Sequence, residues 1–190
     1  MSTATATRAR IAVIGLGNVL FGDDGFGPFV LALLHSRWEF STDVTLVDVG
    51  TPGLDLVTYL QGREAVILVD AVGATGRPGE LRRYRNEELT RMPAKPRVSP
   101  HDPAVQETLL IAQFAGDGPR HVLLIGTIPL SLEQGAGLSA PIHDAASTAA
   151  AMVVDELATL GAAPALRPEP VDVDPWWMRA PATPSSHAAR

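Results

Sequence analysis

Two acidic side chains and one histidine lie where residues of their types can do chemistry. Asp24 follows the apolar run 11–14 across a glycine-rich loop, and Asp70 closes the apolar run 65–70. His101 follows a loop that contains three prolines, and a helical pattern begins soon after it. Two carboxylates and one imidazole with open positions suit a borderline divalent ion such as zinc or nickel. We therefore take Asp24, Asp70 and His101 as the candidate catalytic and metal-contacting residues.

The glycine-rich loop before Asp24 also has a competing interpretation as a dinucleotide-binding turn. Gly15 and Gly17 begin that fingerprint, but Leu20 stands where the third glycine belongs. Asp23 and Asp24 also place negative charge where a pyrophosphate needs hydrogen-bond donors. An N-cap role would account for one of these two acids. For the pair we favour a role in chemistry over helix capping alone.

The elements that must position these residues follow an alternating pattern. Buried strands are predicted at residues 11–14, 44–48, 65–70 and 121–126, with helical spacing of apolar residues between them. This alternation indicates an α/β fold of three layers, with a twisted, mostly parallel sheet of about five strands and helices on both faces. Residues 80–84 are predicted to form a short antiparallel edge strand, because arginines discourage further pairing there. Right-handed crossovers would then bring Asp24, Asp48 and Asp70 to one shared cleft.

Other catalytic schemes find less support in the sequence. It contains no G-x-S-x-G elbow, no H-E-x-x-H helix and no phosphate-binding P-loop. Ser99 lies two residues from His101, but nearness in sequence does not make a catalytic triad. Asp48 and Thr51 could instead orient a bound ligand without touching it. The remaining histidines have no comparable setting, and they are His35, His121, His143 and His187.

Composition limits the possible functions of this chain of 190 residues. The absence of cysteine removes thiol nucleophiles, disulfides and thiolate metal sites, which leaves histidine and carboxylates as the strong ligands. A net charge of −6 gives no electrostatic support to a nucleic-acid partner. No apolar run reaches the length of a membrane span, and the first residues lack the apolar core of a signal peptide. We expect a cytoplasmic protein without a membrane partner, monomeric when isolated.

Three segments of different character divide the chain. Residues 1–10 are predicted to be a flexible N-terminus, and residues 11–160 a single α/β domain. Residues 161–190 are rich in proline and are predicted to form a flexible tail. The adjacent Trp176 and Trp177 are the exception, and we expect them to dock onto the chain's own surface.

The combined motifs resemble those of the nickel–iron hydrogenase maturation endopeptidases, the peptidase family M52-like proteins. The resemblance covers about residues 11–159, and its motifs follow one another in the family's order. The combination is much more specific than any single motif. The matching segments are residues 15–20, 23–27, 48–54, 69–72, 99–101 and 125–126, together with Pro129 and residues 138–139.

The resemblance implies a function as well as a fold. These endopeptidases trim a C-terminal extension from the large-subunit precursor of a nickel–iron hydrogenase after nickel insertion. By resemblance, Asp24, Asp70 and His101 occupy the family's metal-contacting positions and probe nickel that the substrate carries. Zinc or another divalent ion is expected to substitute in vitro. The chain departs from the family where it has Gly126-Thr-Ile-Pro129 in place of Gly-Ile-Gln-Pro, and in its long proline-rich tail.

Two alternatives stay open at this point. The chemical route is either general-base activation of water by a carboxylate or polarisation of the scissile carbonyl by the metal. The rival function is a non-catalytic checkpoint or chaperone that binds the nickel-loaded large subunit without cutting it. Such a relative would be expected to lose part of the acid–acid–histidine set. Because all three residues are present, we favour the enzyme.

Overall fold

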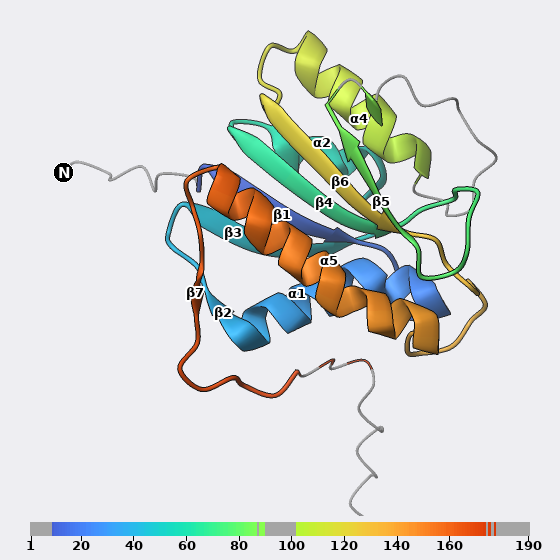
Figure 1. Cartoon of the computed structure of the whole chain (residues 1–190). Helices are drawn as coiled ribbons and strands as arrows, with labels where there is room; N and C mark the ends of the chain where they lie inside the picture. The colour runs from blue at the N-terminus through green and yellow to red at the C-terminus, as the bar shows by residue number, and fades with distance from the viewer. Residues whose placement is uncertain (1–8, 87, 90–101, 174, 176, 178–190) are drawn as a thin grey trace, which may run out of the picture.

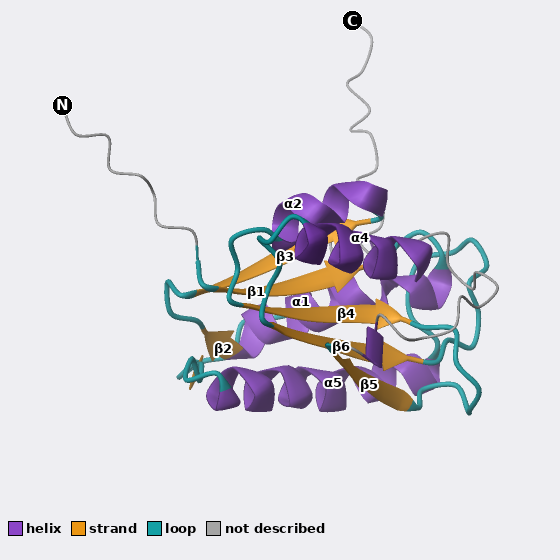
Figure 2. Cartoon of the chain, turned by 90° about the horizontal axis from the view of Figure 1, so that it is seen from above, coloured by secondary structure: helices purple, strands orange, loops and turns teal. Residues whose placement is uncertain are grey.

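A five-stranded sheet forms the middle layer of the structure (Figures 1 and 2). The computed structural model describes residues 9–86, 88–89, 102–173, 175 and 177. The strands are β1 Ile11–Leu16, β3 Val44–Gly50, β4 Ala65–Ala71, β5 Leu81–Arg85 and β6 His121–Thr127. They lie side by side in the order β3-β1-β4-β6-β5.

Helices cover both faces of this sheet (Figure 2). On one face lie α1 Phe26–Arg37 and α5 Ala140–Thr159, and on the other α2 Val57–Leu60 and α4 Asp102–Phe114. Short 3-10 turns, η1 Gly22–Gly25 and η2 Gly53–Leu56, lead directly into α1 and α2. The three-layer α/β fold predicted from the sequence is therefore confirmed.

The direction of the strands gathers the loops that follow them at one edge. Strand β1 pairs in parallel with β3 and β4, and β4 pairs in parallel with β6. Strand β5 pairs antiparallel with β6 at the end of the sheet, as its run of arginines predicted. In Figure 2 the arrowheads of β1, β4 and β6 point the same way. We call the edge to which they point the carboxyl edge.

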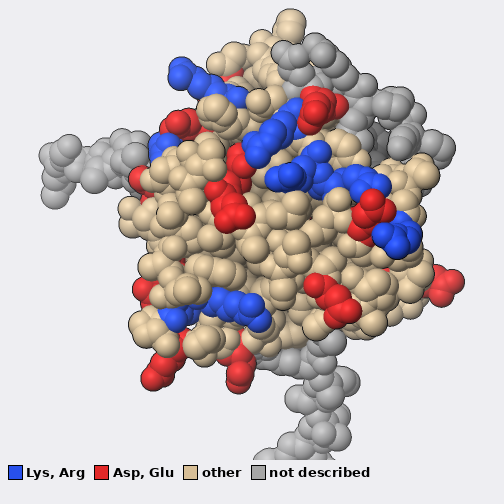
Figure 3. Space-filling view, viewed as in Figure 1, with Lys and Arg blue, Asp and Glu red and all other residues tan. Residues whose placement is uncertain are grey.

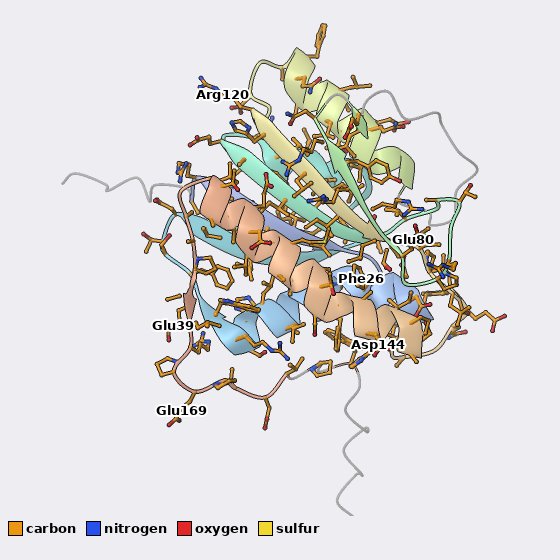
Figure 4. The ribbon with its side chains drawn as sticks, viewed as in Figure 1. Phe26, Glu39, Glu80, Arg120, Asp144 and Glu169 are labelled. Carbon is orange, nitrogen blue, oxygen red and sulfur yellow. The ribbon has the colours of Figure 1, made fainter. Side chains whose placement is uncertain are left out.

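Alternation along the central strands builds two separate apolar cores. In β1 the side chains of Ile11 and Val13 join the core under α1 and α5, whereas Ala12 and Ile14 join the core under α2 and α4. Every residue of β1 and β4 is buried, which explains why their sequences read as continuous apolar runs. Phe26, at the start of α1, is fully buried in the first core (Figure 4).

Helix α1 approaches the sheet closely at its first turn. A Cβ atom on Gly27 would lie 2.3 Å from the carbonyl oxygen of Leu16 and 2.4 Å from that of Val69. Only glycine allows this approach, because any side chain would meet the ends of both strands. The beginning of α1 is thereby fixed against the carboxyl ends of β1 and β4.

The first part of the C-terminal tail is held against the domain, although its composition predicts flexibility. Strand β7, Ala165–Leu166, pairs antiparallel with β2, Trp38–Glu39. The backbone N–H groups of Arg167 and Val171 donate to the carbonyl oxygens of Arg37 and Ser36, at 2.8 and 3.0 Å. Trp177 packs against the core under α1, which is the self-docking expected of the tryptophans, and Trp176 lies outside the described residues. We call residues 165–173 with Trp177 the strap.

Charged side chains of both signs lie on the face shown in Figure 3. On the face shown in Figure 3, basic side chains gather beside β5 with acidic side chains among them. Arg82 of β5 pairs with Glu80 at 2.5 Å, and Arg85 pairs with Glu156 of α5. None of the described helices is both long enough and apolar enough to cross a bilayer.

Candidate active site

Asp24 lies in η1, between the end of β1 and the start of α1. Its Oδ2 accepts a hydrogen bond of 2.7 Å from the backbone N–H of Asn18. The loop can turn this tightly because Gly17 has a φ of +119°, and a Cβ there would lie 1.8 Å from the carbonyl oxygen of Asp24. The two glycines that resemble a dinucleotide-binding turn therefore position a carboxylate.

The second oxygen of the Asp24 carboxylate has no partner in the part of the chain that the structure describes. Asp24 is 4% exposed, and its Oδ1 is buried without a hydrogen bond from any described residue. Buried polar atoms in folded proteins are almost always paired, because desolvation without a partner costs about 1–3 kcal/mol. An unpaired carboxylate oxygen at the carboxyl edge is the arrangement expected of a group that contacts a cation or a reacting proton.

The neighbouring Asp23 has the opposite environment. Its Oδ2 accepts the backbone N–H groups of Leu130 and Ser131 and the hydroxyl of Ser139, at 2.8, 3.0 and 3.0 Å. Its Oδ1 accepts the backbone N–H of Ser139 at 2.7 Å. Asp23 is 1% exposed, so this buried carboxylate joins η1 to the loop after β6 and to the start of α5. Its role is to hold the loops in place.

The sequence had suggested that one of the two acids would serve as a cap. Neither acid does so, because η1 and α1 have no side-chain cap hydrogen bond, and Asp23 instead accepts the backbone N–H of Ser139 at the start of α5. Ser139 occupies the N-cap position of α5, but its hydroxyl makes no cap hydrogen bond and donates to Asp23 instead. This connection joins residues that are 116 positions apart, so no local motif could have indicated it.

Asp70 lies at the carboxyl end of β4. It is 2% exposed, and its Oδ1 accepts the backbone N–H of Ala71 at 2.8 Å. Since Val66 and Leu68 face α2 and α4, strand alternation places Asp70 on the same face of the sheet. The close contact of Gly27 with Val69 brings η1 and the end of β4 together. Asp24 and Asp70 thus both lie at the carboxyl edge.

Asp48 does not share this location, which corrects the expectation of three acids in one cleft. It is exposed at the end of β3, in register with Gly15, whose missing Cβ would contact Leu31 of α1. Asp48 therefore faces α1, on the side of the sheet opposite to Asp70. The reason is the period of two along a strand, because the acids end their strands at positions of different parity.

The groove beside Asp48 has a volume of about 300 Å³ and lies between α1, β3 and the strap. Trp177 and His35 are among its lining residues. Burial, followed by the nearby charge of Arg167, lowers the pKa of His35 below its ordinary value. His35 is therefore neutral at pH 7 and is a weak candidate for a charged ligand-binding group.

His101, the third predicted site residue, lies outside the described residues. The described chain resumes at Asp102, the first residue of α4. The end of α4 leads to the opposite edge of the sheet, where the backbone N–H of Arg120 donates to the carbonyl of Glu64. A helix of 13 residues is about 20 Å long, close to the length of a seven-residue strand. The start of α4 therefore lies toward the carboxyl edge.

Two features at this edge were missed by sequence reasoning. Thr127 is fully buried at the end of β6, and its Oγ1 has no partner among the described residues. The backbone N–H of Asn18 is the donor that orients Asp24. Within the described part of the chain, no three histidine, aspartate or glutamate side chains gather closely enough to hold a metal ion.

Comparison with known proteins identifies the family of this fold and site. The family model described as hydrogenase maturation protease matches residues 28–156, more than half of the chain. The chain belongs to the hydrogenase maturation protease family. It is accordingly a peptide hydrolase of hydrogenase maturation.

Individual relatives of this protease agree with that assignment. The hydrogenase expression/formation protein HupD of Bradyrhizobium diazoefficiens is 35% identical over 163 residues, covering 85% of each chain. The hydrogenase 2 maturation protease of Escherichia coli is 32% identical over 135 residues, covering 70% of this chain and 82% of that protein. The solved structure of the hydrogenase maturating endopeptidase HybD from Escherichia coli superposes with a TM-score of 0.79 at 30% identity. It covers 83% of this chain and 98% of its own.

Proposed function

We propose that this protease removes a C-terminal extension from the large-subunit precursor of a nickel–iron hydrogenase after nickel has been inserted. The single observation that supports this most directly is the buried Asp24 carboxylate, whose Oδ1 has no partner among the described residues. Nickel enters the reaction as cargo of the substrate. A carboxylate oxygen at the carboxyl edge without a partner among the described residues suits a site that is completed only when a nickel-loaded precursor binds.

We propose Asp24, Asp70 and His101 as the residues that contact this nickel and carry the reaction. The hydrogen bond from Asn18 fixes one oxygen of Asp24 and so orients the other toward the incoming group. Asp70 is held by its own backbone at the end of the adjacent strand. Two carboxylates and one imidazole satisfy the preference of a borderline ion while leaving positions for the substrate's ligands.

Two chemical routes fit these residues. In one, a carboxylate takes a proton from the water that attacks the scissile carbonyl. In the other, the substrate's nickel polarises that carbonyl, and the carboxylates hold the nickel in place. In both routes a nickel-free precursor would be a poor substrate, because the peptide bond would not be brought against the acids. Premature trimming would thereby be avoided.

The remaining expectations from the sequence belong to the same proposal. Zinc or another divalent ion is expected to substitute for nickel in vitro, since it accepts the same ligands. The reaction is proposed to occur in the cytoplasm, with the isolated protease as a monomer.

The test is the intact mass of a large-subunit precursor from the same cell, before and after incubation with this protease. The precursor is prepared both with and without nickel. We expect loss of a C-terminal peptide from the nickel-loaded form only. Equal cleavage of both forms would contradict recognition of nickel, and no cleavage of either form would contradict the proposed activity.

The same experiment distinguishes the proposed protease from a checkpoint protein that binds without cutting. A protein that only recognises the loaded subunit would form a nickel-dependent complex while the precursor's mass stays unchanged. Size-exclusion chromatography of the mixture would detect that complex. We favour cleavage because both acids of the set are buried and fixed, which a binding surface does not need.

A further inference from the structure

Three large apolar side chains are exposed close to Asp24. Leu20 is 55% exposed, Phe21 is 42% exposed, and Leu130 is 58% exposed. The first two belong to the loop after β1, and the third belongs to the loop after β6. Exposure of a single leucine is ordinary on a protein surface, but neighbouring exposed apolar side chains usually mark a binding surface. We call these three residues the apolar rim.

The two loops that carry the apolar rim are joined to each other through their backbones. The backbone N–H of Gly135 donates to the carbonyl of Leu20 at 2.9 Å, and the N–H of Gly22 donates to the carbonyl of Gly135 at 2.8 Å. Phe21 and Gly135 form an isolated bridge between the same segments. The loop after β1 is therefore paired with the loop after β6.

The buried Asp23 carboxylate fixes this arrangement from below. It accepts the backbone N–H groups of Leu130 and Ser131, and it lies two residues after Phe21. The exposed side chains are thus presented on a backbone that is already held in one conformation. A preformed surface loses little conformational entropy on binding, which favours a role in recognition.

The position of the rim limits what can cover it. Leu20 and Phe21 belong to the same loop region as the buried Asp24, so a molecule bound on the rim lies over the segment that carries this carboxylate. A second copy of this chain seated there would cover the site, which conflicts with hydrolysis of a large protein substrate. Residues 18–22 contain no charged side chain, and Glu133 is the charged residue of the loop after β6, so the rim itself offers mainly apolar contact.

We infer that the apolar rim docks an apolar stretch of the substrate chain next to the bond that is cleaved. This inference rests on the proposed function, because it names the surface by which the precursor reaches Asp24. Docking on the rim would position the precursor's peptide before the protease contacts the nickel that the precursor carries. It contributes to binding of the precursor equally before and during the reaction, so it affects KM more than kcat.

The test uses Leu20→Ser, Leu130→Ser and the double variant of the full chain, with Phe114→Ser as the matched control. Phe114 is 98% exposed at the end of α4, toward the opposite edge of the sheet. With the nickel-loaded precursor, we expect the KM of each single variant to rise about fivefold to tenfold, with kcat within about twofold. The double variant should show the largest increase, and the control should match the unmodified protease.

Three results would overturn the inference. One is a double variant with the unmodified KM and an unchanged melting temperature. Another is an equal rise in KM for Phe114→Ser. The third is sedimentation that shows a dimer of the unmodified protease which Leu20→Ser converts to monomers, because the rim would then be covered by a second copy.

If the unmodified protease binds the precursor but does not cut it, only the proposed activity fails. The rim variants are then compared by their dissociation constants.

Discussion

At the scale of single residues, two adjacent aspartates carry out different tasks. Asp23 and Asp24 are both buried, but Asp23 accepts four hydrogen bonds while one oxygen of Asp24 accepts none among the described residues. A fully paired carboxylate stabilises the fold that surrounds it. An unpaired one costs free energy in the resting protein, and this cost is recovered only when a ligand binds.

Substitution of Asp23 by asparagine should therefore reduce stability. The amide NH₂ group would face backbone N–H donors of Leu130, Ser131 or Ser139, whichever way the side chain is turned. We expect Asp23→Asn to lower the free energy of unfolding by about 2–4 kcal/mol in urea titrations. The control is Asp48→Asn at an exposed position, which should change the free energy of unfolding by less than about 0.5 kcal/mol. Equal stability of the two variants would contradict this role of Asp23.

At the scale of elements, an ion pair connects the edge strand β5 to α5. Both terminal guanidinium nitrogens of Arg85, Nη1 and Nη2, donate to the carboxylate of Glu156, at 2.7 and 2.5 Å. Glu156 is 8% exposed, and its pKa is lowered chiefly by this hydrogen bond and further by the positive charge of Arg85. The same partner raises the pKa of Arg85. The pair fixes the final strand of the sheet on the helix that begins beside Asp23.

This pair predicts a pH dependence of stability. Because the pKa of Glu156 is lower in the folded protein, its contribution is fully present above the ordinary value of 4.5 and is lost as the pH falls through the lowered value. Glu156→Gln should be less stable than the unmodified protein at pH 7. The difference should shrink as the pH is lowered below about 4. Urea unfolding over this range measures it, and a difference that stays constant with pH would contradict the assignment.

The sequence predicted the positions of the strands along the chain better than the face of the sheet on which each side chain lies. Apolar runs predicted β1, β3, β4 and β6, and the arginines predicted the antiparallel edge strand β5. Strands β2 and β7 have two residues each, and their pairing depends on contacts between residues that are far apart in the sequence. The face on which Asp48 lies depends on register, which no single strand sequence specifies.

At the scale of the whole molecule, the strap runs along the end of α1 and β2. Its β7 segment pairs with β2, and the side chain of Arg167 donates to the carbonyl of His35 at 3.0 Å and contacts Glu39 at 3.4 Å. Figure 4 labels Glu39 of β2 and Glu169 of the strap on the same side of the molecule. Helix α1 begins directly after η1, which carries Asp24, so the strap stabilises the helix next to the candidate site.

Truncation of the strap's tryptophan should therefore weaken the domain. Trp177 contacts the core under α1 and lines the groove beside Asp48. We expect Trp177→Ala to lower the free energy of unfolding by about 1–2 kcal/mol, since the indole is partly buried. Phe114→Ala is the control, because that ring is 98% exposed and its loss should have little effect. An unchanged melting temperature for Trp177→Ala would show that the strap is not part of the folded unit.

The candidate site could be predicted only in part for physical reasons. Local spacing singled out Asp24 and Asp70 as candidates, because each follows an apolar strand, and the structure places both residues at the carboxyl edge. It did not distinguish Asp23 from Asp24, because the partners that separate them lie more than 100 residues away. The position of His101 lies outside the described residues, so its role stays a prediction.

One measurement tests most directly whether Asp24 Oδ1, which has no partner among the described residues, takes part in the reaction. The intact mass of the nickel-loaded precursor is followed after addition of Asp24→Asn or the unmodified protease. Asparagine has nearly the same size and keeps an oxygen for Asn18, but it has no negative charge. We predict cleavage slower by at least about a hundredfold with a melting temperature that is not lowered. Cleavage by Asp24→Asn at the unmodified rate would contradict the account.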